Sequence, residues 1–194
     1  MILKIRQAGE LALRQKARPL SRDEILDRST QELIESMRET MYDAPGVGLA
    51  APQIGCSLQL VVVEDQTEFI QKLPPEQVTE RERRPVPFHV LINPKLTLVG
   101  GETVEFFEGC LSVAGFTAVV PRARKVRVEA LNENAEPVTI DADGWYARIL
   151  QHEIDHLCGM LYIDRMNSRT FCTQDNYVRH WKDRSVAEAT GYDE

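Results

Sequence analysis

The stretch that decides the fold is residues 143–159, "DGWYARILQHEIDHLCG". Its apolar spacing predicts a helix, and Gly159 stands where a glycine commonly ends one. His152 and His156 are four residues apart, so their imidazoles project from one helix face and can reach one cation. Glu153, beside the first histidine, points off the ligand axis, where a carboxylate suits a general base. The alternative, a surface helix that merely holds two histidines, requires a chance match of the order of one in a hundred.

Short apolar runs separated by turn residues precede this helix. Between residues 88 and 140 they predict a mostly antiparallel β region, and "LQLVVVE" at 58–64 predicts a buried strand. Ser21 to Glu24 has the pattern of a helix capping box, and one helix is predicted from there to Asp43. The predicted fold class is α+β, with mostly antiparallel β-sheets packed around a central helix that carries the H-E-x-x-H metal-binding motif.

Length and charge limit the other functions. At 194 residues the chain fits one domain, residues 1–194, and its formal net charge of -7 disfavours direct nucleic-acid binding. The sequence has no long apolar run, signal peptide or transit pattern, so we expect a cytoplasmic protein with no membrane partner. Residues 65–87 are polar and proline-rich, and we predict a surface insertion whose basic run, 81–84, faces solvent. Residues 177–194 are predicted to be a tail with a short helix at 176–182.

The third metal ligand has to come from elsewhere in the chain. In metzincin endopeptidases the motif extends to a third histidine, but here Tyr162 stands at that position. His89 and His180 are more simply interpreted as structural or exposed. Cys110 is the better candidate: it lies in a predicted strand, after Gly109, which would let another backbone come close. A thiolate with two imidazoles leaves a coordination position open for water, as catalytic sites do. The remaining cysteines are predicted to be buried or inert, with Cys158 in the core: Cys56, Cys158 and Cys172.

A glycine-rich stretch raises a competing hypothesis. Residues 46–51, "GVGLAA", match the G-x-G-x-x-A outline of a dinucleotide-binding turn. That turn needs a strand before the glycines and a helix after them, whereas here the predicted helix comes first and Pro52 stands where the second helix would run. The nucleotide-binding hypothesis is therefore rejected.

Three stretches, taken in order, closely resemble the motifs of peptide deformylase: "GVGLAAPQ" at 46–53, "EGCLS" at 108–112 and "QHEIDH" at 151–156. The resemblance covers roughly residues 2–170. It implies a metal-dependent hydrolase that removes the N-formyl group from the initiator methionine of newly made polypeptides and releases formate. Ala114-Gly115-Phe116 in place of a proline, together with the long insertion, resembles the longer, organelle-type branch of the family.

The resemblance also implies roles for individual residues. The implied metal ligands are Cys110, His152 and His156. The implied catalytic residues are Glu153 as acid and base, and Gln53 and Leu111, whose side-chain amide and backbone N–H would bind the oxyanion. The implied substrate contacts are Val47, Gly48, Gly109, Phe106, Trp145 and Ile149, with the backbone at Val47 and Gly48 pairing with an extended peptide. Arg148, one step round the helix, is expected at the pocket mouth or in solvent.

The implied cofactor is one divalent metal ion per chain, with iron(II) first; zinc, nickel or cobalt would suit the same ligands. The implied partners are N-formyl-methionyl peptides and nascent chains. A transient contact with the ribosome and the oligomeric state are left open.

Two alternatives to the deformylase function remain. The first is an H-E-x-x-H zinc endopeptidase, against which Tyr162 and the Cys110 motif both count. The second is a structural metal site, which would need a fourth protein ligand and would leave Glu153 without a role.

Overall fold

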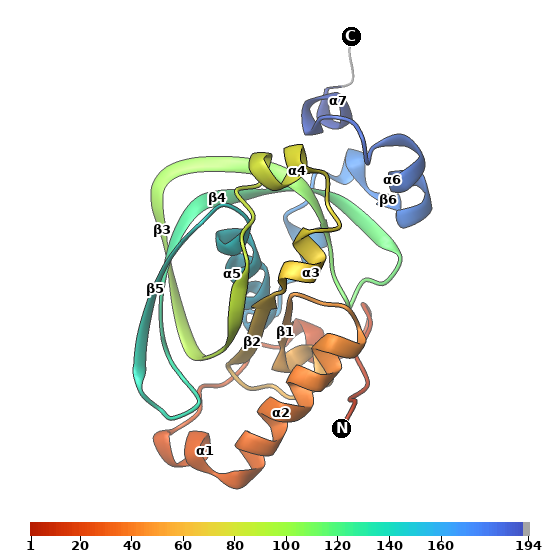
Figure 1. The fold of residues 1–194 in the computed structure, drawn as a ribbon. Coiled ribbons are helices and arrows are strands. Elements are labelled where there is room, and N and C mark those ends of the chain that lie inside the picture. The colour runs from red at the N-terminus through yellow and green to blue at the C-terminus, as the bar shows by residue number, and fades with distance from the viewer. Residues whose placement is uncertain (192–194) are drawn as a thin grey trace.

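The computed structural model describes residues 1–191, and its centre is a six-stranded antiparallel sheet that curves around one helix, α5 (Figure 1). The strand order is β1-β2-β3-β4-β5, with β6 paired to β4. The strands are β1 Gly48–Ala50, β2 Leu60–Asp65, β3 Val86–Gly109, β4 Phe116–Leu131, β5 Pro137–Asp143 and β6 Cys172–Thr173. The predicted α+β class is confirmed, and the separate apolar runs predicted for the β region join into the long strands β3 and β4.

The helix with the metal-binding motif is α5, Gly144–Leu157, which ends before Gly159, a residue with φ of 75°. The other α-helices are α1 Arg22–Leu26, α2 Arg28–Asp43, α3 Thr67–Ile70, α4 Pro75–Glu80, α6 Gln174–His180 and α7 Val186–Thr190. The 3-10 helices are η1 Leu11–Arg14, η2 Ala51–Ile54, η3 Tyr162–Asp164 and η4 Ser168–Thr170. In residues 1–191 no helix is long and apolar enough to cross a membrane.

The helix predicted from Ser21 to Asp43 is wrong in one respect, because it is two helices. Asp27 has φ -66° and ψ 142°, which is extended backbone, so α1 ends there. Its side chain accepts a hydrogen bond of 2.8 Å from the backbone N–H of Ser29 and so caps α2. The predicted capping box at Ser21 and Glu24 is present at the start of α1.

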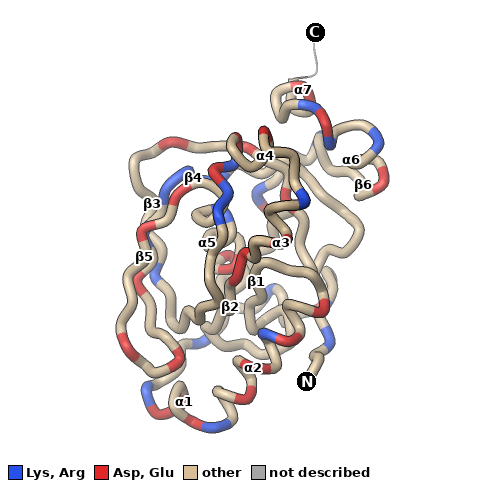
Figure 2. The backbone as a smooth tube through the Cα atoms, in the orientation of Figure 1, with Lys and Arg blue, Asp and Glu red and all other residues tan. Residues whose placement is uncertain are grey.

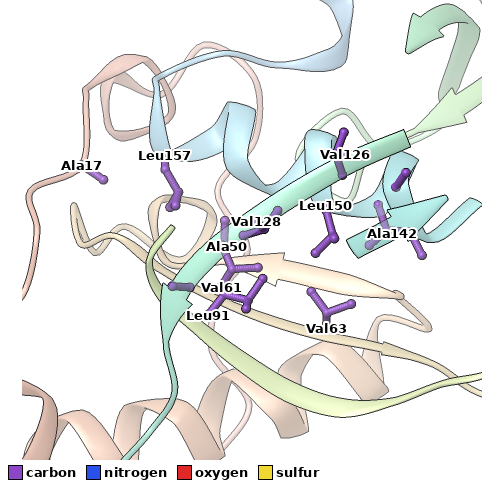
Figure 3. Close-up of a cluster of buried hydrophobic side chains, with 13 residues drawn as sticks. Ala17, Ala50, Val61, Val63, Leu91, Val126, Val128, Ala142, Leu150 and Leu157 are labelled. Carbon is purple, nitrogen blue, oxygen red and sulfur yellow. The ribbon is translucent and has the colours of Figure 1, made fainter. Parts of the chain in front are cut away.

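Strand β2 explains why the sheet is enclosed on both faces. Val61 and Val63 point to α5 and join Leu150 in one buried cluster (Figure 3). Leu60 and Val62 point the opposite way, toward Met37, Met41 and the rest of the apolar face of α2. Alternate residues of a strand face opposite sides, so a run that is apolar throughout requires cover on both sides.

Residues 65–87 contain α3 and α4, and the predicted solvent exposure of their basic run holds for Arg84 but is wrong for Arg81 and Arg83. The Arg83 side chain is only 10% exposed and forms two hydrogen bonds of 2.8 Å with Asp65, which is 1% exposed. The Arg81 guanidinium lies 4.9 Å from the ring centroid of Trp145. Composition indicates charge but not the tertiary contacts that bury it.

The tail is more ordered than the sequence indicated. The short helix predicted at 176–182 overlaps α6, which begins two residues earlier, whereas α7 was not predicted. Residues 192–194, the end of the predicted tail, lie outside the described residues.

Asp27→Ala should lower the free energy of unfolding by about 1 kcal/mol, because the first turn of α2 loses its side-chain cap. Urea unfolding followed by circular dichroism measures the change. Glu35→Ala, an exposed substitution in the middle of the same helix, is the matched control and should stay within about 0.5 kcal/mol. Equal effects of the two substitutions would contradict the capping role of Asp27.

Candidate active site

The three predicted metal ligands come together where the end of β3 meets α5. One ligand atom from each of Cys110, His152 and His156 lies within 4.8 Å of the others. Cys110 Sγ is 3.4 Å from His156 Nε2. Cys110 was predicted to lie in a strand, but it lies in the turn that comes after Gly109. That turn places the thiol of Cys110 near the helix. The spacing of the two histidines alone could not predict this position.

Both histidines hold their Nδ1 atoms away from this cluster. His152 Nδ1 lies 2.9 Å from Glu108 Oε2, and His156 Nδ1 lies 3.1 Å from the carbonyl oxygen of Met160. A carboxylate or carbonyl oxygen accepts, so each Nδ1 is the donor and each Nε2 is left with its lone pair for a cation.

The electrostatics of the cluster also fit a divalent cation. Burial alone would lower the pKa of His152, but its hydrogen bonds with Cys110 and Glu108 raise that pKa well above the ordinary value. Burial lowers the pKa of His156. A positive charge is therefore favoured at His152 and disfavoured at His156, and a bound cation would take the place of the proton on His152.

Glu108 is the negative centre behind the histidines. It accepts hydrogen bonds from Arg122 Nε at 2.9 Å and Arg122 Nη2 at 3.0 Å, and from Arg148 Nη1 at 2.6 Å, besides that from His152. Burial raises the pKa of its carboxyl, but the hydrogen bonds from His152 and Arg122 outweigh burial and hold the pKa below its ordinary range. Arg148 was expected at the pocket mouth or in solvent: it lines the cavity, but it is 2% exposed and not in solvent, because its guanidinium donates to Glu108.

A second carboxylate extends this network. Asp155 accepts from Arg122 Nη1 and forms two hydrogen bonds, of 2.7 and 2.8 Å, with Arg165. Both acids lie within motifs that the sequence reasoning singled out, but it gave neither a role. The available sequence signal for Glu108 was its place two residues before a candidate thiolate ligand. The sequence held no signal for its arginine partners.

Glu153 faces the cluster from α5 and is enclosed. Within residues 1–191 its Oε2 atom is buried with no hydrogen-bond partner, and burial raises the pKa of the carboxyl to about 7. A side chain at Gly48 would overlap it, because a Cβ there would lie 2.6 Å from Glu153 Cδ and 2.7 Å from Cγ. The second glycine of the glycine-rich stretch is thus required by the close approach of a carboxylate.

Gln53 is held so that its amide nitrogen faces the same place. Its Oε1 accepts a hydrogen bond of 2.8 Å from the backbone N–H of Ala50. Its Nε2 donates to Ser112 Oγ at 3.3 Å and lies 3.6 Å from Cys110 Sγ. The side chain is buried at 1% exposure, so the orientation of the amide is fixed.

The amino-terminal segment supports the turn that carries Cys110, and sequence reasoning missed this. Gln7 Nε2 donates to the carbonyl oxygen of Leu111 at 2.9 Å, and the backbone N–H of Ala8 donates to Ser112 at 2.8 Å. The N–H of Arg6 donates to the carbonyl oxygen of Gln53 at 2.7 Å. One short segment therefore fixes both sides of the site.

A cavity of about 460 Å³ opens beside the cluster. Five of the six residues predicted to contact substrate line it, together with Gln53 and Leu111, which were predicted to bind the oxyanion; the five are Val47, Gly48, Gly109, Trp145 and Ile149. Phe106 is not among the lining residues, and its contact with substrate stays a prediction. It packs edge-on against Trp145, with ring centroids 6.1 Å apart, and Phe107 lines the cavity instead, because neighbouring strand residues face opposite sides.

One smaller prediction is corrected and another stays open. Within residues 1–191 a Cβ on Gly109 would meet nothing nearer than 3.6 Å, so no backbone of this chain comes close there, and the approach of a substrate backbone stays a prediction. Cys158 is exposed and not in the core, because it comes after the last turn of α5. Cys56 and Cys172 are partly buried, and burial raises the pKa of both thiols, which agrees with the inert role predicted for them.

Fold and site together define an α+β protein with a candidate mononuclear metal centre of one cysteine and two histidines, a buried carboxylate and an open cavity. The sequence model of the polypeptide deformylase family matches residues 2–171, and the chain belongs to this family.

Named relatives agree with this assignment. The chain is 48% identical over 170 residues to peptide deformylase 1A, chloroplastic, of Solanum lycopersicum, which covers 88% of this chain and 61% of the relative. It is 44% identical over 179 residues to peptide deformylase 3 of Streptomyces avermitilis, a match that covers 92% of this chain and 78% of the relative. A Met-Ala-Ser-bound class I type b peptide deformylase from Acinetobacter baumannii superposes with TM-score 0.76 at 32% identity, covering 86% and 99%.

The chain spans 61% of the length of the tomato relative and 63% of that of a second plant relative, from Arabidopsis thaliana. The chloroplastic relative agrees with the expected likeness to the organelle-type branch. The roles inferred for individual site residues stay predictions.

Glu108→Gln should weaken metal binding about 10- to 100-fold, because His152 loses the anion that orients its ring and makes it more basic. Competition with a chromophoric chelator for zinc measures the affinity. Glu105→Gln, on the same strand but exposed, is the control. Unchanged affinity in a folded Glu108→Gln protein would contradict the supporting role of Glu108.

Gly48→Ala should lower the free energy of unfolding by about 1–3 kcal/mol, because the added methyl group overlaps Glu153. In a Glu153→Ala background the same substitution should cost under about 0.5 kcal/mol, since the overlapping carboxylate is gone. Urea unfolding of all four proteins, with metal removed by a chelator, completes the cycle. Equal costs in the two backgrounds would show that the glycine serves another purpose.

Proposed function

We propose that this chain is a peptide deformylase in activity: a metal-dependent hydrolase that removes the N-formyl group from the initiator methionine of newly made polypeptides and releases formate. The observation that carries the proposal is the buried Oε2 of Glu153, which has no hydrogen-bond partner among the described residues and lies beside the Cys110, His152 and His156 cluster at an open cavity. A structural metal site would leave such a carboxylate without a role.

Cys110, His152 and His156 would hold one divalent ion, and we propose iron(II) in the cell, with zinc, nickel or cobalt suiting the same ligands. Such an ion supplies Lewis-acid polarisation of a carbonyl oxygen and lowers the pKa of water. The Glu108 and Met160 contacts of the two imidazoles support this assignment, because they present both Nε2 atoms in their metal-binding form.

Glu153 would act as the base and then the acid. An amide resists hydrolysis because its carbonyl is resonance-stabilised and its nitrogen is a poor leaving group. The carboxylate would take a proton from the attacking water and return it to the departing amine. The raised pKa of Glu153, about 7, supports both halves of this exchange, since the group can hold or release a proton near neutrality.

The oxyanion would be bound by donors of this chain. The Nε2 atom of Gln53 is directed to the cluster by the Ala50 contact, and Leu111 lines the same cavity. We propose that the Gln53 amide and the Leu111 backbone N–H donate to the developing negative charge. The Gln7 contact on the carbonyl of Leu111 holds that backbone in place. Preorganised donors of this kind lower the barrier because they need no rearrangement during the reaction.

The peptide itself would lie along β1. This strand is at the end of the sheet order and pairs with β2 on one side. We propose that an extended peptide adds to its other side at Val47 and Gly48, as in β-augmentation. The methionine side chain would then enter the apolar part of the cavity, between Trp145 and Ile149. Nascent chains as the substrate source and a cytoplasmic location belong to the same proposal.

Protein prepared anaerobically and loaded with iron(II) or nickel should release formate from a formyl-Met peptide and leave its acetyl twin intact. Glu153→Ala should keep its metal and lose about 10²- to 10⁴-fold in kcat, the usual contribution of a general acid–base group. Formate is measured by a coupled dehydrogenase, and metal by elemental analysis. Cys110→Ala is the companion variant and should lose the metal itself.

The same assay separates the alternatives. Cleavage of internal peptide bonds without formate release would indicate a zinc endopeptidase. A metal-loaded protein with neither activity, and with a silent Glu153→Ala substitution, would indicate a structural metal site.

A further inference from the structure

The segment between β2 and β3 ends against the first turn of α5. The backbone N–H of Trp145 donates to the carbonyl oxygen of Arg81 at 2.9 Å. A Cβ on Gly144 would lie 2.6 Å from Glu82 Cβ and 2.9 Å from that same carbonyl oxygen, so the glycine allows the contact. Residues 81–83, here called the brace, are thus seated directly on the start of the helix that carries the metal-binding motif.

The brace is fixed at its base by a buried ion pair. Arg83 Nε and Nη2 each lie 2.8 Å from an oxygen of Asp65, the last residue of β2. Both side chains are nearly inaccessible, and paired hydrogen bonds between planar groups define a single geometry. The loop of residues 66–82 is therefore closed on itself, and Figure 2 shows the basic run after α4 beside α5.

Two cations of the brace and one of α5 lie around the indole of Trp145. The guanidinium carbons of Arg81, Arg83 and Arg148 lie 4.9, 5.4 and 5.8 Å from its ring centroid. Arg83 and Arg148 also bind carboxylates. Arg81 differs, because its Nε is buried and has no hydrogen-bond partner within residues 1–191. A guanidinium within about 6 Å of an aromatic ring is attracted to the ring face, and that of Arg81 lies 4.9 Å from the Trp145 centroid and 5.8 Å from that of Phe106.

Trp145 in turn forms a wall of the cavity beside the metal cluster. It is the second residue of α5, and the ends of helices lack the backbone hydrogen bonds that hold the interior. Its Nε1 is buried without a hydrogen-bond partner in residues 1–191, so no polar contact sets the rotation of the indole. Its position depends on the brace and on Phe106.

We propose that the brace, through Arg81, is the positioning element of the methionine pocket: it holds Trp145 in place and thereby sets the side chain that the cavity accepts. This inference rests on the proposed deformylase function and assigns a role to residues 65–87. Arg81 does not line the cavity, so it acts on substrate only through Trp145. A displaced indole would loosen contacts with a straight methionine side chain and admit branched or bulkier ones.

The test compares Arg81→Met, which keeps an unbranched apolar stem but removes the guanidinium, with Arg81→Lys and Arg84→Met. Arg84 belongs to the same basic run, is 53% exposed and pairs with Asp143, so Arg84→Met is the matched control. Formate release is followed with formyl-Met, formyl-Leu and formyl-Phe peptides. All proteins also carry Trp181→Phe, which leaves Trp145 as the sole tryptophan and its fluorescence as a local signal.

Arg81→Met should raise KM for the formyl-Met peptide about fivefold, the effect of one partly desolvated cation–π contact. Its kcat should stay within about twofold, because uniform binding is lost and the reacting groups are untouched. The preference for formyl-Met over formyl-Leu should shrink, and Trp145 emission should shift to the red. The KM and emission of Arg81→Lys should lie between those of the parent protein and of Arg81→Met, since an ammonium keeps the charge but not the planar stack.

Three results would overturn the proposal: unchanged KM and emission in folded Arg81→Met protein, equal effects of Arg81→Met and Arg84→Met, or a fall in kcat with KM preserved. A variant that fails to fold is replaced by Arg81→Lys, judged by the same readouts. Failure of the deformylase function is distinguishable, because the parent protein would then release no formate. The emission of Trp145 would still report whether Arg81 holds the indole.

Discussion

The buried carboxylate of Glu108 is the interaction on which the rest of the site depends. It lies at the end of β3 and receives hydrogen bonds from Arg122 on β4 and from Arg148 and His152 on α5. An unpaired charge at this depth would be costly. Removal of any one partner would therefore be destabilising, because it would leave a buried charge uncompensated. The two long strands and the central helix are therefore locked at one point, two residues from the thiol of Cys110.

Local signals predicted α5 and the main strands, and the spacing of His152 and His156 predicted the helix face that carries them. Alternating apolar runs predicted the antiparallel strands, because such patterns depend only on neighbours in the chain. The sequence could not assign Phe106 and Phe107 to their faces, since that choice depends on which side of β3 meets α5. Nor could it indicate that Arg148 turns inward, because its partner lies 40 residues away.

The basic run near α4 is a second case in which the sequence could not predict a tertiary contact. Charged residues are usually solvated, and this expectation failed for Arg81 and Arg83 because Trp145 and Asp65 offer them partners in the fold. Gly48 was predicted to pair with an extended peptide, and the structure adds a second reason for the glycine, because it makes room for Glu153. In both cases the role of the residue depends on a neighbour that is distant in the chain.

The place of β1 at the end of the sheet has a consequence for solubility. An open strand edge can pair with any extended chain, including another copy of the same protein, and long edges of this kind promote aggregation. Here the edge is three residues long, with Pro45 before it and Pro52 after it, neither of which can donate a backbone hydrogen bond. The edge is thus long enough to hold the first residues of a peptide and too short to begin a fibre.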